Sequence, residues 1–377
     1  MYKKLLYILL CLPIILTTGC WDSRDINEKC IVISLGVDRV DSLIEFSGEI
    51  VKLTKTKESE EQAKSSGVYT LLSYGRTFEE ARVNYNSNNP YPTFLGATRV
   101  TVFGENYAKE GIEPYVNRID SLYDYRKTLL PVVSREPPKE IFEIETNKDI
   151  AIGFLIDDIL THLKETDASI CPNIGDLLSV IAFGQEGFLI PYIGKELNDI
   201  KYIGLCVFKD SKLVDIIDIK DTKPILYLLG NNPKIIEVIP NPLNDENKYS
   251  FSVKIDKRTI NTSYINNNIV IDVNLDLDAE LRYQYYIKKL DDKMLKDLEN
   301  QLTVKITDSI QEMIARAQKK FECDIFTFGQ IFKSQHLEEY NKINWEDAFL
   351  TAAINVNVKT EIINKNLKSA DKKEDNN

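Results

Sequence analysis

The stretch DDKMLKDLENQLTVKITDSIQEMIARAQKKF, residues 291–321, contains the longest regular pattern in the chain. Apolar residues recur in it at every third or fourth position: Leu295, Leu298, Leu302, Ile306, Ile310, Met313, Ala317 and Phe321. This spacing places them on one side of an α-helix of roughly 45 Å, at about 1.5 Å per residue. We expect this apolar side to cover a sheet. In an alternative interpretation, part of it also faces a partner protein.

Strand patterns surround this helix. Alternating apolar residues predict strands at 269–279 and 354–363, and further strands are expected at 235–239, 249–256 and 264–265, with a turn at Asn266–Asn268. Residues 202–208 and 213–219, joined by the turn 209–212, predict a hairpin. Short helices are expected at 222–230 and 345–353. The C-terminal half therefore combines strand meanders with one long helix.

The N-terminal half mixes strands and helices. Strands are predicted at 31–37, 43–53, 68–74, 94–103, 128–134 and 188–193, and helices at 77–88, within 104–123, at 149–164 and at 174–183. Thr77 and Glu80 have the spacing of a capping box. Pro137 and Pro138 predict a break. The fold class is α+β and multidomain, with mixed or antiparallel sheets, flanking helices and one long helix in the C-terminal half.

Length and composition set the domain organisation. A chain of 377 residues is long enough for two or three domains. The polar residues 195–201 predict a boundary between an N-terminal domain at 20–195 and a C-terminal domain at 200–365. In an alternative division, the latter consists of two subdomains at 200–232 and 233–365. The charged tail 366–377 is predicted to be disordered.

The first twenty residues predict export and lipidation. Lys3 and Lys4 precede an apolar stretch at 5–16 that is shorter than the roughly 20 residues a membrane-spanning helix needs. Small residues then lead to Gly19 and Cys20. We expect residues 1–19 to be a removable signal peptide and Cys20 to become an S-diacylglycerol, N-acylated cysteine. Two or three acyl chains hold a protein durably on a membrane. In the alternative, the signal peptide is an ordinary one and Cys20 an unmodified cysteine.

Composition argues against several other functions. A net charge of −11 argues against binding to nucleic acid, because phosphate contacts need concentrated Lys and Arg. Cys30, Cys171, Cys206 and Cys323 are widely spaced, which favours buried thiols and leaves one or two disulfides open. His162 and His336 lie far apart in the sequence and are expected to be structural or exposed.

No catalytic or metal-binding pattern emerges from the sequence. It contains no nucleophile elbow, no phosphate-binding glycine loop and no zinc-protease motif. One acidic row alternates with apolar residues along a predicted strand, and we interpret it as a solvated face: Asp272, Asn274, Asp276, Asp278 and Glu280. No enzymatic activity, cofactor or metal is predicted.

Several stretches together resemble the Ger(x)C family of spore germination lipoproteins. Residues 19–28, GCWDSRDINE, are similar to the opening of the mature family sequence. Residues 75–81, 102–105, 202–209, 212–214 and 323–329 resemble further family motifs, and so do Trp345 and Phe349. The sequence departs from the family at Ala97, Asp215 and Thr327, where the family has His, Gly and Gly.

The resemblance implies a function. The chain would be the C subunit of a GerA-type nutrient germinant receptor, anchored by lipid in the spore inner membrane and facing outward. It would assemble with polytopic A and B subunits to trigger germination. Whether this subunit contacts the nutrient stays open, with scaffolding favoured. The alternatives are an extracytoplasmic solute-binding lipoprotein of a transporter and, third, a lipid-anchored hydrolase.

Overall fold

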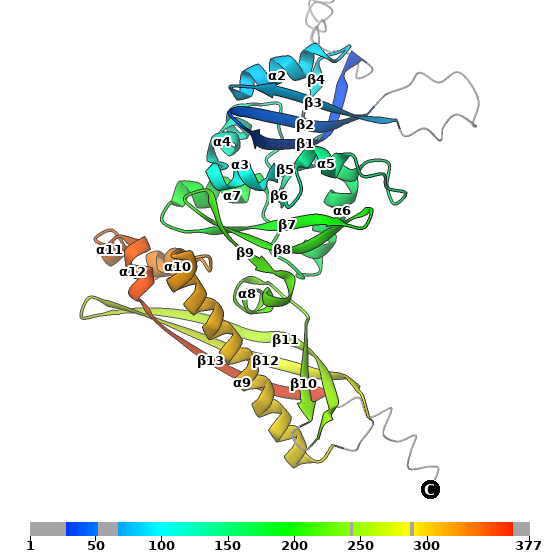
Figure 1. Ribbon diagram of the computed structural model, residues 1–377. Coiled ribbons are helices and arrows are strands. Elements are labelled where there is room, and N and C mark those ends of the chain that lie inside the picture. Colours follow the sequence, from blue (N-terminus) through cyan, green and yellow to red (C-terminus); the bar gives the residue numbers. More distant parts are fainter. Residues whose placement is uncertain (1–27, 52–66, 242–243, 287–289, 365–377) are drawn as a thin grey trace, which may run out of the picture.

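Two β-sheets with separate helical layers make up the protein (Figure 1). The computed structural model describes residues 28–51, 67–241, 244–286 and 290–364. Sheet A contains the first nine strands and sheet B the last four. The α+β class with mixed sheets is therefore confirmed.

Sheet A is mixed, with the strand order β3-β2-β1-β5-β6-β7-β8-β9 and the short β4 beside β1. Its strands are β1 (Cys30–Val40), β2 (Leu43–Val51), β3 (Val68–Gly75), β4 (Thr93–Phe94), β5 (Val100–Gly104), β6 (Leu130–Ser134), β7 (Phe188–Glu196), β8 (Asp199–Lys209) and β9 (Lys212–Asp218). The central strands β1, β5, β6 and β7 are parallel, whereas the outer pairs at both ends are antiparallel.

Helices cover both faces of sheet A. One hydrophobic cluster joins the sheet to α2 (Phe78–Ser87), α3 (Glu105–Glu110), α4 (Glu113–Ser121) and α7 (Ile174–Phe183). A second cluster joins it to α5 (Pro138–Phe142) and α6 (Ile152–Glu165). All residues of β5 and β6 are buried, as expected for parallel strands between two helical layers.

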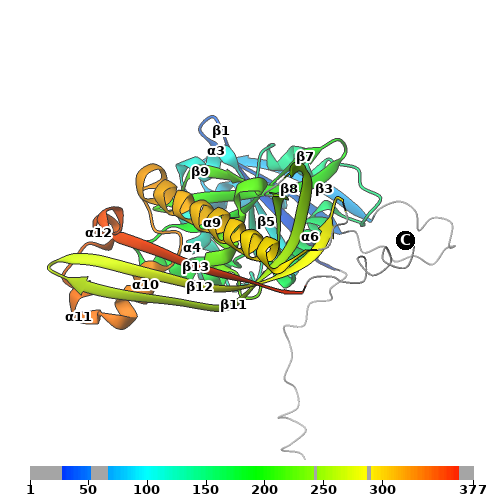
Figure 2. The ribbon, with the colours of Figure 1, turned by 90° about the horizontal axis from the view of Figure 1, so that it is seen from below.

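Sheet B has the order β10-β11-β12-β13 and a single helical layer. Its strands are β10 (Ile235–Asn241), β11 (Asn244–Ile265), β12 (Asn268–Gln284) and β13 (Ala353–Asn364). Helix α9 (Asp292–Arg316) and the π-helical turn η3 (Ala317–Phe321) lie across one face (Figure 2). Helices α10 (Phe328–Gln335), α11 (Leu337–Tyr340) and α12 (Trp345–Thr351) lead to β13, which pairs with β12 in parallel.

The long helix is confirmed, and its apolar side covers a sheet. The eight residues of the predicted stripe are all buried in the core under sheet B. Asp291 caps the helix, because its side chain accepts a hydrogen bond from the Met294 amide at 2.7 Å. The π-helical turn ends at Glu322, whose φ is +53°.

Several predicted elements differ in detail. The strand expected at 94–103 is two strands, because a turn at Leu95–Thr98 separates β4 from β5. The strands expected at 249–256 and 264–265 are one, since the polar residues between them pair with β12. Thr77 does cap α2, but the Glu80 carboxylate accepts from the Arg76 amide instead of the Thr77 amide. Helices α5, α10 and α11 were not predicted.

The chain passes from sheet A to sheet B through η2 (Ile219–Asp221) and α8 (Lys223–Leu229). The predicted boundary at 195–200 falls within the hairpin of β7 and β8, so main-chain pairing continues across it. Helix α8 follows the last strand of sheet A, yet its residues Ile225 to Leu228 belong to the core of sheet B. The domain boundaries themselves stay a prediction.

Candidate functional site

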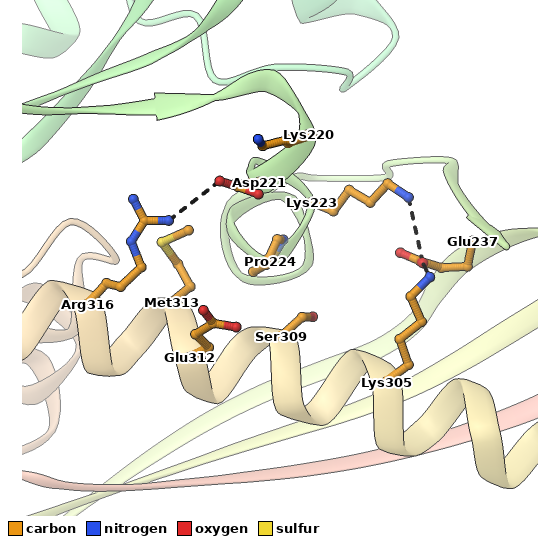
Figure 3. Close-up of a pocket in the computed structure, with 10 residues that line it drawn as sticks. All are labelled: Lys220, Asp221, Lys223, Pro224, Glu237, Lys305, Ser309, Glu312, Met313 and Arg316. Carbon is orange, nitrogen blue, oxygen red and sulfur yellow. Dashed lines mark ion pairs between the residues drawn. The ribbon is translucent and has the colours of Figure 1, made fainter. Parts of the chain in front are cut away.

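A pocket of about 260 Å³ lies between α8, β10 and α9 (Figure 3). Helix α8 begins at Lys223 and has Pro224 in its first turn, where the missing N–H costs nothing. Its buried side chains pack against α9 and hold this wall in place. The pocket is lined by Lys220, Asp221, Lys223, Pro224, Glu237, Lys305, Ser309, Glu312, Met313 and Arg316. It therefore sits where the chain passes from sheet A to sheet B.

A buried carboxylate lies at one end of the pocket. The Glu237 side chain is only 4% exposed, and its Oε2 lies 2.7 Å from Lys305 Nζ and 3.6 Å from Lys223 Nζ. Both lysines also donate to main-chain oxygens of β10, at Val238 and Ile236. Burial, and then the nearby Glu237 charge, raise the pKa of Tyr227 well above its usual range. This end is fixed by two cations on one acid.

The other end of the pocket is looser. Arg316 lies 3.8 Å from Asp221 and 4.0 Å from Asp215, which Lys320 approaches more closely at 2.6 Å. In the described part of the chain, Lys220 and Glu312 have no ion-pair partner. Four cationic and three acidic side chains line the pocket, so its lining carries one net positive charge. Such a lining can attract a small anion.

A second feature connects the two sheets by hydrogen bonds. We call it the joint: Gln185, Glu186 and Gly187 before β7, together with Asp324, Gly329, Gln330 and Trp345. The Gly187 amide donates to the Asp324 carbonyl at 2.8 Å, and the Trp345 amide donates to Gln185 Oε1 at 2.9 Å. These bonds tie the loop before β7 to the helices that follow α9.

Asp324 is the buried centre of the joint. Its Oδ2 accepts from the Gly329 amide at 2.8 Å and from Trp345 Nε1 at 3.1 Å, and its Oδ1 accepts from the Phe326 amide at 2.8 Å. Burial nevertheless raises its pKa to about 6. Burial and the neighbouring Asp324 charge raise the pKa of Glu186 to about 7. No cation is bonded to either carboxyl in the described structure.

Close packing requires a glycine within the joint. A Cβ atom on Gly329 would lie 2.6 Å from both Glu186 Oε1 and Trp345 Nε1. Thr327, which begins α10, has a φ of +60°, a conformation that costs energy for a β-branched residue. The resemblance to family motifs indicates 323–329 and Trp345, but nothing in the sequence pattern identifies their partner Glu186.

The residues singled out from the sequence do not come together in a site. Cys20 lies outside the described residues, so its lipidation stays a prediction. Cys30, Cys171, Cys206 and Cys323 are buried and unpaired. His162 is exposed on α6, and His336 donates through Nε2 to the Thr262 carbonyl oxygen at 2.9 Å and packs on Phe332. The described cysteines and histidines are therefore buried, exposed or bonded to the main chain, and none of them forms part of a site.

The acidic row of β12 faces away from α9, as expected. Its alternating neighbours, including Val273, Leu275 and Leu277, are buried under the helix. The row itself bonds to adjacent strands: Asn355 donates to Asp272 at 2.8 Å, and Lys254 pairs with Glu280 at 2.9 Å. The described residues contain no cluster placed to hold a metal ion.

Among the described residues, no helix is both long and apolar enough to cross a bilayer.

Family models match both halves of the chain. Residues 22–195 match the model described as "Spore germination protein N-terminal domain", and residues 203–366 match "Spore germination B3/ GerAC like, C-terminal". The chain belongs to the Ger(x)C family. The family resemblance inferred from the sequence motifs is thus confirmed, and the two matches together cover nearly the whole of this Ger(x)C chain.

Individual relatives are distant. The putative spore germination protein YfkR of Bacillus subtilis (strain 168) is 26% identical to this chain over 264 residues. The matched region is 64% of this chain and 65% of YfkR, so it spans slightly less than two thirds of that protein. Spore germination protein B3 of the same strain is 20% identical and covers 92% of this chain and 94% of its own. The crystal structure of the GerBC protein matches 88% of this Ger(x)C chain and 97% of its own, with a TM-score of 0.53 and 17% identity. This likeness supports the fold.

Proposed function

We propose that this Ger(x)C protein is the lipid-anchored C subunit of a nutrient germinant receptor. It acts with A and B subunits at the spore inner membrane, catalyses no reaction, and helps to trigger germination. The observation that carries the proposal is the match of both halves to spore germination models, over 22–195 and 203–366. The relatives are likewise named for spore germination.

Anchoring by lipid is part of the same proposal. The short apolar segment at 5–16 and the Gly19-Cys20 junction are typical of a lipoprotein signal. An acylated Cys20 would hold the folded part, which contains no spanning helix in its described residues, beside membrane-embedded subunits.

A solute-binding lipoprotein is the weaker alternative. Such proteins usually have two matched lobes of repeated βα units. Sheets A and B differ in strand number and order, and their helical layers differ as well. The asymmetry favours a subunit that joins dissimilar surfaces.

Deletion of the gene from the organism that encodes it tests the receptor role. Mutant spores should lose the response to one class of nutrient while vegetative growth stays normal. Reintroducing the wild-type gene should restore the response. Mutant spores that respond normally to every nutrient tested, in a strain without a second receptor of this type, would refute the proposal.

Replacing Cys20 tests the anchor separately. We expect the wild-type protein to partition into the detergent phase of a Triton X-114 extract and the Cys20→Ala variant to leave it. Cys30→Ala, which alters a buried thiol, is the control and should behave as wild type. If Cys20→Ala stays in the detergent phase, the lipid anchor is not at this residue.

A further inference from the structure

A second pocket, of about 170 Å³, lies where the parallel strands β1, β5 and β6 of sheet A begin. Arg99 immediately precedes β5, and Arg126 lies shortly before β6. Parallel strands begin at the same edge of a sheet, which brings these two side chains to one place. We call it the arginine pocket, and its lining consists of Arg99, Arg126, Ile31, Ile33, Val51, Ala97 and Phe154.

Hydrogen bonds hold the walls of the arginine pocket in place. The Arg99 amide donates to the Ile33 carbonyl at 2.7 Å, and the Arg99 carbonyl accepts from the Leu130 amide at 2.9 Å. Phe154 lies in the first turn of α6, whose start is fixed by hydrogen bonds to the Glu49 carboxylate. The pocket is therefore formed by fixed elements of sheet A and the helix that covers it.

The two arginines of the pocket keep their positive charges uncompensated. In the described part of the chain, neither guanidinium has an ion-pair or hydrogen-bond partner, and the lining contains no acidic residue. Asp157 on α6 does not neutralise Arg99: burial raises the pKa of this carboxyl, the Arg99 charge offsets that only in part, and the two form no ion pair. The pocket therefore attracts an anion.

The chemistry of the lining favours a phosphate group joined to a carbon chain. A guanidinium offers a planar fork of N–H donors that matches two oxygens of a phosphate or carboxylate. Two forks from separate elements suit a phosphate better, because its oxygens point in several directions, whereas a carboxylate has only two oxygens in one plane. The five apolar lining residues suit the carbon atoms attached to such a group. A volume of about 170 Å³ holds a headgroup and excludes a protein segment.

The place of the pocket in the chain identifies a source for such a ligand. Ten positions separate Cys20 from Cys30, where β1 begins, and Ile31 and Ile33 of β1 line the pocket. Ten residues span at most roughly 35 Å even when fully extended. A lipid-anchored Cys20 therefore keeps the pocket close to the membrane surface, and the tether raises the local concentration of lipid headgroups around it.

We propose that the arginine pocket binds the phosphate headgroup of an anionic phospholipid in the membrane that holds the Cys20 anchor. Arg99 and Arg126 donate to the phosphate oxygens, and Ile31 and Phe154 contact the carbon atoms next to the headgroup. This second contact fixes which side of sheet A faces the bilayer, which a single point of attachment cannot do. The source of the ligand rests on the proposed lipid anchor, whereas the preference for phosphate rests on the pocket alone.

Native mass spectrometry of the full-length lipidated chain in detergent tests the ligand class. The probes are dimyristoyl phosphatidylglycerol, which is anionic, and dimyristoyl phosphatidylcholine, which has the same acyl chains and no net charge. We expect one bound phosphatidylglycerol per chain, at least about fivefold more abundant than the phosphatidylcholine adduct at equal concentration. Excess glycerol 3-phosphate, which has the phosphate without acyl chains, should not displace it. Absent or equal lipid adducts would overturn the proposal, and so would displacement by glycerol 3-phosphate, which would indicate a site for a soluble phosphate.

Substitutions locate the site. Arg99→Gln and Arg126→Gln should each lower the phosphatidylglycerol adduct by at least about fivefold. Both should melt as wild type, because neither guanidinium is bonded within the described protein. Arg76→Gln, at an exposed arginine outside the pocket, is the control and should keep the adduct.

Two results with these variants would contradict the proposal. An adduct that survives in both pocket variants would mean that the lipid binds elsewhere. An equal loss in Arg76→Gln would mean unspecific attraction of anionic lipid to surface arginines. Failure of the anchor itself is a separate outcome, because it is measured by the detergent partition of Cys20→Ala.

Discussion

Sheets A and B carry acidic residues at alternating positions of one strand, yet bury them differently. In β2 of sheet A, Glu45 and Glu49 are 1% and 3% exposed, because α5 and the start of α6 cover that face. In β12 of sheet B, Asp276 is exposed, because the single helical layer lies on the other face. The alternation is the same, so what decides burial is whether a helix covers the face.

Burial requires that each acid in sheet A finds partners. Glu45 pairs with Lys139 at 2.9 Å. Glu49 accepts from the amides of Ile152 and Gly153 at 2.8 and 2.6 Å and from Ser34 Oγ at 2.7 Å. It thereby satisfies two of the free amides at the start of α6. Asp276 of β12 is exposed, so water can solvate its carboxylate instead.

The largest effect should come from the covered face of sheet B. Leu275→Ala removes a side chain that is 1% exposed under α9, and we expect a loss of about 3 kcal/mol in the free energy of unfolding, because a cavity remains. Val304→Ala on the outer side of α9, where the side chain is 59% exposed, is the control. Urea unfolding measures both variants. Equal losses would mean that α9 does not cover the sheet as described.

A buried acid of sheet A should come next. Glu49→Gln places an amide NH₂ against backbone N–H donors of α6, and we expect a loss of about 2 kcal/mol, because a buried donor loses its acceptor. Glu338→Gln, on the exposed surface of α11, makes the same chemical change without burial. Urea unfolding of the two should differ. A Glu49 variant as stable as wild type would show that the covering helix does not depend on this carboxylate.

At the joint, one substitution should stabilise the protein. Thr327 has a φ of +60° at the start of α10, and glycine adopts this conformation without the steric cost of a branched side chain. Thr327→Gly should therefore raise the free energy of unfolding by about 1 kcal/mol. Thr303→Gly within α9, where glycine only weakens a helix, should lower it. Thermal melting distinguishes the two directions.

The carboxyls of the joint should make stability depend on pH. Burial raises the pKa of Asp324 to about 6 and that of Glu186 to about 7, above the ordinary values of the unfolded chain. The folded state therefore binds more protons between about pH 4 and pH 7, and its stability falls as pH rises through that range. Glu186→Gln should flatten this dependence, because the amide has no proton to lose in this range. The Gln330 amide can rotate to offer its oxygen to the new NH₂ group, so the hydrogen bond is kept.

Urea midpoints at several pH values measure that effect. We expect the free energy of unfolding of the wild type to fall more than that of Glu186→Gln between pH 4.5 and 7.5, by about 1 kcal/mol over the range. Glu338→Gln, with an exposed carboxylate, should keep the wild-type slope. Parallel curves for wild type and Glu186→Gln would mean that the joint does not retain its proton.

The sequence predicted local periodicity well and contacts between distant residues poorly. The α9 stripe, the acidic row of β12 and most strands followed from spacing alone. The burial of Glu49 did not, because its partners at 152 and 153 are about a hundred positions away. The same holds for the pocket, whose residues come from 220–237 and 305–316 and show no motif. Family motifs indicated Asp324 and Trp345, but only the structure connects them to Glu186.

The smallest effect is expected on the open face of sheet B, beside the residue with the largest. Asp276→Asn removes one charge from a solvated row and should change the free energy of unfolding by less than about 0.5 kcal/mol, because water replaces whatever contact is lost. Leu275 is the preceding residue of the same strand and lies on the opposite, covered face. Comparing the two variants therefore separates the effect of the face from the effect of the strand. Urea unfolding in parallel with Leu275→Ala makes the comparison. A loss for Asp276→Asn as large as that for Glu49→Gln would mean that another layer covers this face in solution.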